Sequence, residues 1–124
     1  MKTARTLAAL FMGMALAGPL PAEAAGMKKE VKIGVLTDMA SAYSDLVGPG
    51  SVIAAQLAIE DFTNSEKPDF KVTLISADHQ NKPDIASSIA REWFQVAGVD
   101  MITDVTGASV ALAVSKLAPI YNKV

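Results

Sequence analysis

The chain has 124 residues, a hydrophobic content of 51% and a formal net charge of −2 at pH 7. This length allows one small domain or part of a larger one, and the hydrophobic content argues against disorder. There is no basic stripe after the leader and no cysteine, which argues against nucleic acid as a partner and excludes disulfides, thiolate metal sites and a lipoprotein anchor.

The first 24 residues are typical of a secretory signal. They contain a positive start, an apolar core and a small-x-small cleavage site, which are Lys2 and Arg5, Leu7 to Ala17, and Ala22-Glu23-Ala24. We therefore expect cleavage after Ala24 and export of residues 25–124. A retained membrane anchor is the alternative, but the run is shorter than the roughly 20 apolar residues that a membrane span requires.

The stretch Val31 to Thr37 is apolar and rich in β-branched residues, which predicts a first strand buried on both faces. A long polar loop follows. A helix is expected to begin near Pro49 or Gly50, because proline is tolerated at the first helical position, and Asn64 to Asp69 should end it. Apolar residues at three- and four-residue spacing predict its core-facing stripe: Val52, Ala55, Ala58, Ile59 and Phe62.

A second strand is predicted over Phe70 to Ala77, and its alternation of apolar and polar residues indicates less burial than in the first. Pro83 and Asp84 start a second helix, with an acid near the positive end of the helix dipole, and Gly98 is placed to end it. The predicted apolar face of this helix comprises Ile85, Ala86, Ile89, Ala90, Trp93, Phe94 and Ala97.

A third strand is predicted over Val99 to Val105, followed by a turn, Thr106 to Ser109, and a helix from Val110 to Tyr121. The inward residues of that helix are expected to be Val110, Val114, Leu117 and Ala118. The β-α-β-α-β-α pattern predicts an α/β fold with a Rossmann-like parallel sheet, strand order 2-1-3 and flanking helices. The loops after strands one and three should then face each other across one crevice, and the open sheet edge indicates part of a larger domain.

The turn after the third strand is the most suggestive candidate site. Its members are Thr106, Gly107, Ala108 and Ser109. Small residues let a ligand approach the backbone, and the free N–H groups at the start of the next helix favour a carboxylate. Alternatively, Ser109 only caps its own helix.

Other polar residues also follow the predicted strands. Tyr43 can stack on a bound molecule or cover the edge of the core. Asp38, Asp78 and Asp104 can attract an amine or a cation, or accept local backbone N–H groups. His79, the single histidine, is expected to make one or two hydrogen bonds in a loop.

No metal, cofactor or catalytic motif is visible. One histidine and no cysteine argue against a transition-metal site, and Trp93 is expected in the core. Gly48-Pro49-Gly50 fails as a dinucleotide fingerprint at Ile53, and there is neither a P-loop nor a G-x-S-x-G motif. We therefore expect no cofactor and no enzyme activity.

Several segments together resemble the start of a periplasmic solute-binding protein of ABC transporters, in the type I, leucine/isoleucine/valine-binding group. After the leader they are Val31 to Asp38, Tyr43-Ser44-Asp45, Gly48-Pro49-Gly50-Ser51 and Ala77 to Asp84. The resemblance covers residues 25–124 but only the amino-terminal part of such a protein. It implies a partial first lobe of a two-lobed receptor, which closes on a small solute and presents it to a membrane permease.

The resemblance also implies binding residues and a class of solute. In this family the turn after strand three offers hydroxyl and N–H groups to the ligand carboxylate, at positions that correspond to Ala108 and Ser109, with Thr106 and Gly107 in the approach. A tyrosine of the first loop often lines the pocket, as Tyr43 would here. Many members carry a hydroxyl residue where this chain has Ala108. Solutes of such proteins are branched-chain amino acids, amides or aromatic acids.

Three other interpretations of the chain remain open at this point. The chain can be a truncated, non-functional fragment of such a protein, or the ligand-sensing domain of a signalling receptor. A secreted enzyme of flavodoxin-like topology is the third, and no catalytic residues support it.

Overall fold

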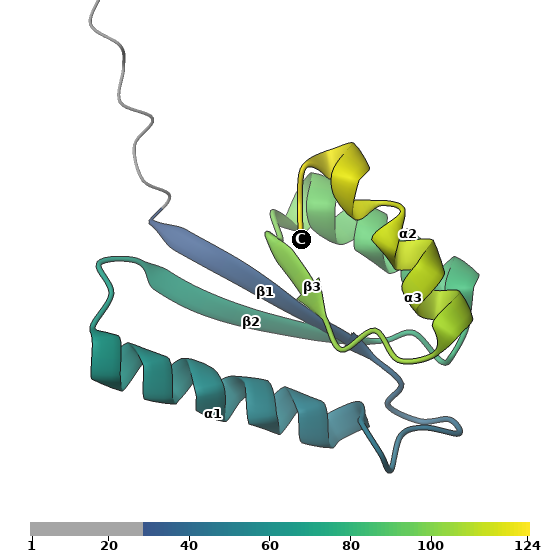
Figure 1. Cartoon of the computed structure of the whole chain (residues 1–124), viewed down its shortest axis with the longest axis horizontal. Helices are drawn as coiled ribbons and strands as arrows, with labels where there is room; N and C mark the ends of the chain where they lie inside the picture. The colour runs from purple at the N-terminus through teal and green to yellow at the C-terminus, as the bar shows by residue number, and fades with distance from the viewer. Residues whose placement is uncertain (1–28) are drawn as a thin grey trace, which may run out of the picture.

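The computed structural model describes residues 29–124, so the predicted signal and its cleavage site lie outside the described residues. The strands and α-helices are β1 (Glu30–Thr37), α1 (Gly48–Glu66), β2 (Lys71–Asp78), α2 (Pro83–Glu92), β3 (Met101–Thr103) and α3 (Ala108–Ser115). The strands pair in parallel in the order β2-β1-β3 (Figure 1). The predicted fold class and strand order are confirmed.

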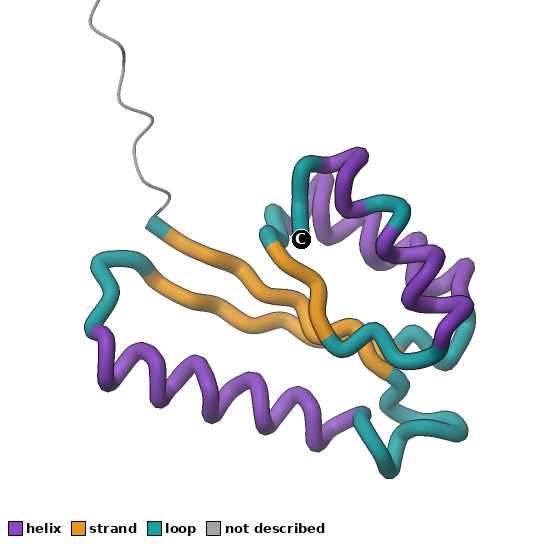
Figure 2. Tube along the Cα trace, in the orientation of Figure 1, coloured by secondary structure: helices purple, strands orange, loops and turns teal. Residues whose placement is uncertain are grey.

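The sheet carries helices on both faces. Figures 1 and 2 show α1 along one face and α2 with α3 on the other. The buried core lies on the α2 and α3 side and includes Leu36, Ala90, Trp93, Val110 and Val114. The predicted apolar faces of the second and third helices are thus confirmed, and so is the place of Trp93 in the core.

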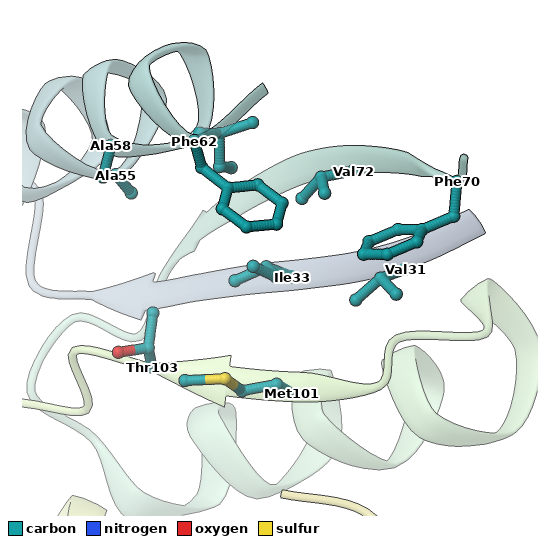
Figure 3. A pocket seen from close by; sticks show the side chains of 10 residues that line it. Val31, Ile33, Ala55, Ala58, Phe62, Phe70, Val72, Met101 and Thr103 are labelled. Carbon is teal, nitrogen blue, oxygen red and sulfur yellow. The ribbon is translucent and has the colours of Figure 1, made fainter. Parts of the chain in front are cut away.

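The face under α1 is packed more loosely. An apolar cavity of about 430 Å³ lies between α1 and the sheet, and Figure 3 shows the side chains that line it. Side chains of the predicted stripe, including Ala55, Ile59 and Phe62, line it from the helix side. This confirms which face of α1 is turned to the sheet. Ile53 and Leu57 on the rest of α1 are 57% and 56% exposed.

The central strand is more buried than its neighbour, as expected. Gly34, Val35, Leu36 and Thr37 are fully buried, whereas the first half of β1 is half-buried. No residue of β2 is buried. Burial of β1 on both faces is therefore confined to the half that lies nearest the carboxyl edge of the sheet.

Strand β3 is shorter than the predicted Val99 to Val105. Asp104 has φ 60°, and this left-handed conformation ends the extended backbone. Before the strand, Asp100 stays tied to β1, because its N–H donates to the Lys32 carbonyl at 2.8 Å and its Oδ2 accepts from the Lys32 N–H at 2.9 Å. On the outer edge, Val124 donates to the Asp100 carbonyl (3.1 Å) and accepts from the Ile102 N–H (2.8 Å), the hydrogen-bond pattern of a parallel neighbour.

The first two helix ends are as predicted, whereas the third differs. Helix α1 ends at Lys67, within the predicted stretch Asn64 to Asp69, in the left-handed conformation. After α2 the chain makes a π-helical turn, Trp93–Ala97, before Gly98 ends it at φ 70°. The third helix stops at Ser115 and is followed by a 3₁₀ turn, Ala118–Tyr121, because Pro119 has no N–H to continue an α-helix. Across residues 29–124, no helix combines the length and the apolar character that crossing a membrane needs.

Candidate functional site

The carboxyl ends of the three strands form one edge of the sheet, where the loops diverge. The loop after β1 leads to α1 on one face, whereas the turn after the neighbouring β3 leads to α3 on the other (Figure 2). Open α/β sheets bind ligands where neighbouring strands send their connections to opposite faces. The switch point between β1 and β3 is therefore the candidate site.

The turn after β3 leaves the start of α3 free. Gly107 is the N-cap residue, with φ 91° and no side-chain capping hydrogen bond, and the helix begins at Ala108. Ser109 thus lies inside the first turn, so the interpretation that it caps its own helix is wrong. Ala108 and Ser109 are exposed, and the first N–H groups of a helix have no partner within it. The turn therefore presents a hydroxyl and backbone donors at the positive end of the helix dipole.

The loop after β2 supports this turn from behind. A Cβ atom added to Gly107 would lie 2.8 Å from Oδ1 of Asn81, so the Asn81 side chain would have to shift, and the φ of 91° is strained for any other residue. Gln80 and Asn81 both have φ near 50° (53° and 52°), so the loop turns sharply at these two residues. Sequence reasoning missed Asn81, although its tolerance of the left-handed conformation was a usable signal.

In the loop after β1, Asp38 organises the backbone. This buried carboxylate accepts hydrogen bonds from the Ser41 N–H (2.9 Å), the Ser41 hydroxyl and the Tyr43 N–H (3.1 Å). Asp78 does the same at the end of β2, accepting from the Met39 and Gln80 N–H groups at 3.1 and 2.7 Å. The local role of these two aspartates is confirmed.

Tyr43 is placed by that loop with its ring accessible. Its side chain is 40% exposed, and within residues 29–124 its hydroxyl makes no hydrogen bond. The alternative that Tyr43 covers the core is not supported, because the buried cluster and the hydrophobic residues packed against it do not include it.

Replacing Asp38 with alanine is expected to destabilise the chain and loosen this loop. The Ser41 hydroxyl and N–H groups of the loop lower the pKa of Asp38. The stabilisation is therefore complete above the ordinary pKa near 3.9 and is lost as the pH falls through the lower folded value. Urea unfolding from pH 2 to 7 should show a lower midpoint for Asp38→Ala. The midpoint of this variant should also fall less as the pH is lowered. Asp45→Ala, an exposed residue of the same loop, should leave both unchanged.

A group of polar atoms is buried beneath the site. His79 has no exposed surface, and its Nδ1 accepts from the Asn81 N–H at 2.9 Å. Burial lowers the pKa of His79, whereas Asp38, Asp78 and Asp104 act to raise it. In the described part of the chain, Thr37 Oγ1, His79 Nε2 and Asp104 Oδ2 are buried without a hydrogen-bond partner. Asp104 thus differs from Asp38 and Asp78, whose carboxylates accept backbone N–H groups.

Residues 29–124 contain no cluster of three or more histidine, cysteine, aspartate or glutamate side chains that could hold a metal ion. What the edge offers is hydrogen-bond donors, an accessible tyrosine and a free helix start. Such groups are chemically suited to hold an anionic group.

The comparisons with known proteins agree with this picture. The sequence profile of the family described as "Periplasmic binding protein" matches residues 30–123. No curated protein matches by sequence. Among solved structures, a branched chain amino acid ABC transporter periplasmic ligand-binding protein from Burkholderia xenovorans LB400 is 51% identical, with a TM-score of 0.69 over 76% of this chain and 25% of that one.

Two further solved structures extend the likeness. A periplasmic binding protein from Burkholderia mallei is 40% identical, with a TM-score of 0.69 over 77% of this chain and 25% of its own. A solute binding protein of an ABC transporter from Rhodopseudomonas palustris BisB5, in complex with 3,4-dihydroxybenzoic acid, is 20% identical, with a TM-score of 0.58 over 73% of this chain and 24% of its own, and shares the fold. The chain therefore spans about a quarter of the length of these proteins.

Proposed function

The chain belongs to the periplasmic binding protein family, and we propose that it is part of the substrate-binding component of an ABC uptake transporter. In this proposal residues 1–24 are a signal cleaved after Ala24, and residues 25–124 form part of the amino-terminal lobe. The lobe binds a small carboxylate-bearing solute at a cleft with a second lobe and presents it to a membrane permease. The role is binding and delivery, without catalysis.

The free start of α3 at the switch point carries this proposal. Ala108 and Ser109 are exposed there, and the Ser109 hydroxyl makes no hydrogen bond with the rest of residues 29–124. Backbone N–H groups at a helix start, with one hydroxyl beside them, suit a carboxylate. Thr106 and Gly107 would form the approach to this group, and Tyr43 would line the pocket from the loop after β1.

The relatives support a carboxylate as the shared ligand group. The protein from Burkholderia xenovorans is named for branched-chain amino acids, and the one from Rhodopseudomonas palustris holds 3,4-dihydroxybenzoic acid. Both ligands carry a carboxylate, while the rest of each molecule differs. We therefore propose that this chain binds the carboxylate of its solute, and that the solute is a branched-chain amino acid, an amide or an aromatic acid.

Ligand-dependent thermal unfolding of the purified chain tests this proposal. A ligand that binds the folded state raises the midpoint, so one class in a panel of branched-chain amino acids, amides and aromatic acids should do so. Ser109→Ala should weaken that ligand by roughly 10-fold or more, because a hydrogen bond to a charged group contributes about 1.5–3 kcal/mol.

Ser115→Ala is the matched control for this experiment. Ser115 lies at the other end of α3, and its hydroxyl donates to the Leu112 carbonyl at 3.2 Å, so its loss should leave ligand affinity unchanged. A ligand shift that is the same in Ser109→Ala and in the unsubstituted chain would contradict the assigned carboxylate site. A panel in which no ligand moves the midpoint would contradict binding by this chain.

A further inference from the structure

His79 lies buried behind the site in one defined protonation state. Its Nδ1 accepts a hydrogen bond from the Asn81 N–H at 2.9 Å. A neutral imidazole has one donor and one acceptor nitrogen, so an acceptor at Nδ1 places the proton on Nε2. That Nε2–H has no partner within residues 29–124. A donor without a partner in a fully buried side chain calls for an acceptor nearby.

Asp104 supplies an acceptor of matching chemistry. Its Oδ2 is also buried and without a partner in the described residues. Asp104 directly follows β3 and His79 directly follows β2, so both lie at the carboxyl edge of the parallel sheet. An unsatisfied buried donor or acceptor costs on the order of 1–3 kcal/mol. One water molecule can satisfy both, since buried waters typically bridge polar groups that otherwise have no partner.

We propose that His79 is a positioning residue for the turn Thr106 to Ser109, and that one buried water joins its Nε2–H to the Oδ2 of Asp104. The inference rests on the proposed function, because that function uses this turn. Each ring nitrogen is linked to the turn through one other residue. Nδ1 accepts from Asn81, whose Oδ1 lies 2.8 Å from the position of a Cβ on Gly107. Through the water, Nε2 holds Asp104, the left-handed residue at the end of β3.

The charges around His79 make this support dependent on pH. Asp38, Asp78 and Asp104, one from the end of each strand, favour the imidazolium, but burial opposes it more strongly. The pKa of folded His79 therefore lies below the ordinary 6.5. Above about pH 6.5 the ring is neutral in both the folded and the unfolded chain. As the pH falls below that value, only the unfolded chain takes up the proton at first, so stability is lost.

Nitrogen-15 NMR of the purified chain tests the proposal directly, since His79 is the only histidine. At pH 7 we expect the neutral tautomer with the proton on Nε2 and a cross peak from that proton to a bound water. The midpoint of ring titration should lie below 6.5, and the amides of Thr106 to Ser109 should shift with the same midpoint. Asp104→Asn should lower that midpoint further, because it removes a charge that favours the imidazolium.

Two variants separate positioning from a merely local role. His79→Gln keeps a donor near the Nε2 position and cannot titrate, whereas His79→Asn keeps an acceptor near Nδ1 for the Asn81 N–H and lacks the far donor. Because each variant breaks one of the two links to the turn, we expect the amides of Thr106 to Ser109 to move in both variants. Turn amides that keep their native shifts in both would show that His79 only closes its own loop, and would overturn the proposal.

The unsubstituted chain decides the matter if neither variant folds. A proton on Nδ1, the absence of a bound-water cross peak, or turn amides that do not follow the ring titration would each overturn the inference. None of these readouts requires a ligand, so their failure is distinct from a failure of the thermal-shift experiment that tests the proposed function.

Discussion

Replacing Gly34 with valine is expected to abolish the cooperative unfolding transition of the chain. Gly34 lies in the buried half of β1, and a Cβ there would meet the Trp93 ring at 2.3 Å from Cζ3 and 2.5 Å from Cε3. Trp93 is only 8% exposed and belongs to the core cluster, so the ring cannot withdraw without opening the core.

The expected loss is large compared with the stability available. Overpacking a core costs about 1–3 kcal/mol and more where the neighbour is rigid, and small proteins have about 5–15 kcal/mol in total. Circular dichroism during urea unfolding should show Gly34→Ala with a clearly lower midpoint and Gly34→Val without a cooperative transition.

Gly50→Ala is the control for the added side chain. A Cβ at Gly50, in the first turn of α1, would have no atom within 4 Å, so its midpoint should stay close to that of the unsubstituted chain. Combining Gly34→Ala with Trp93→Leu should cost less stability than the sum of the two single substitutions. The smaller leucine side chain leaves room for the Cβ that Gly34→Ala adds. A normal unfolding curve for Gly34→Val would refute the close approach of the central strand to Trp93.

Replacing Gly107 with alanine is expected to damage both stability and the candidate site. At φ 91° an L-residue is strained, and the new Cβ would lie 2.8 Å from Asn81 Oδ1. The strain costs roughly 1–2 kcal/mol, and the contact adds to it by pushing the turn away from the loop after β2. Any ligand found by thermal shift should bind at least about 10-fold more weakly, corresponding to 1.4 kcal/mol or more.

Gly98→Ala separates these two effects. Gly98 is also left-handed, at φ 70°, but a Cβ there would meet no atom within 4 Å, so it should lose only the strain energy and leave ligand affinity unchanged. Adding Asn81→Ala to Gly107→Ala should remove the contact and restore part of the stability. Equal losses for Gly98→Ala and Gly107→Ala would show that Asn81 does not press on the turn.

The sequence by itself determined the parallel sheet, its strand order and the inward faces of the helices. The strands and helix faces follow from local periodicity and from Pro49, Pro83 and Gly98 near the helix ends, because each depends on residues within a few positions. The strand order follows from the usual connectivity of repeated β-α units. The position of the small-residue turn beside α3 follows in the same way, since a parallel strand must end before its crossover helix begins.

Only the tertiary structure decided how neighbouring backbones meet. Two contacts join segments that are distant in the chain, namely Trp93 with Gly34 and Asn81 with Gly107. The end of β3 at Thr103 was also visible only in the structure. The complete burial of His79 is of the same kind, since a polar loop sequence carries no sign of what will cover it. Such contacts depend on the distance between folded elements, which hydrophobic periodicity does not contain.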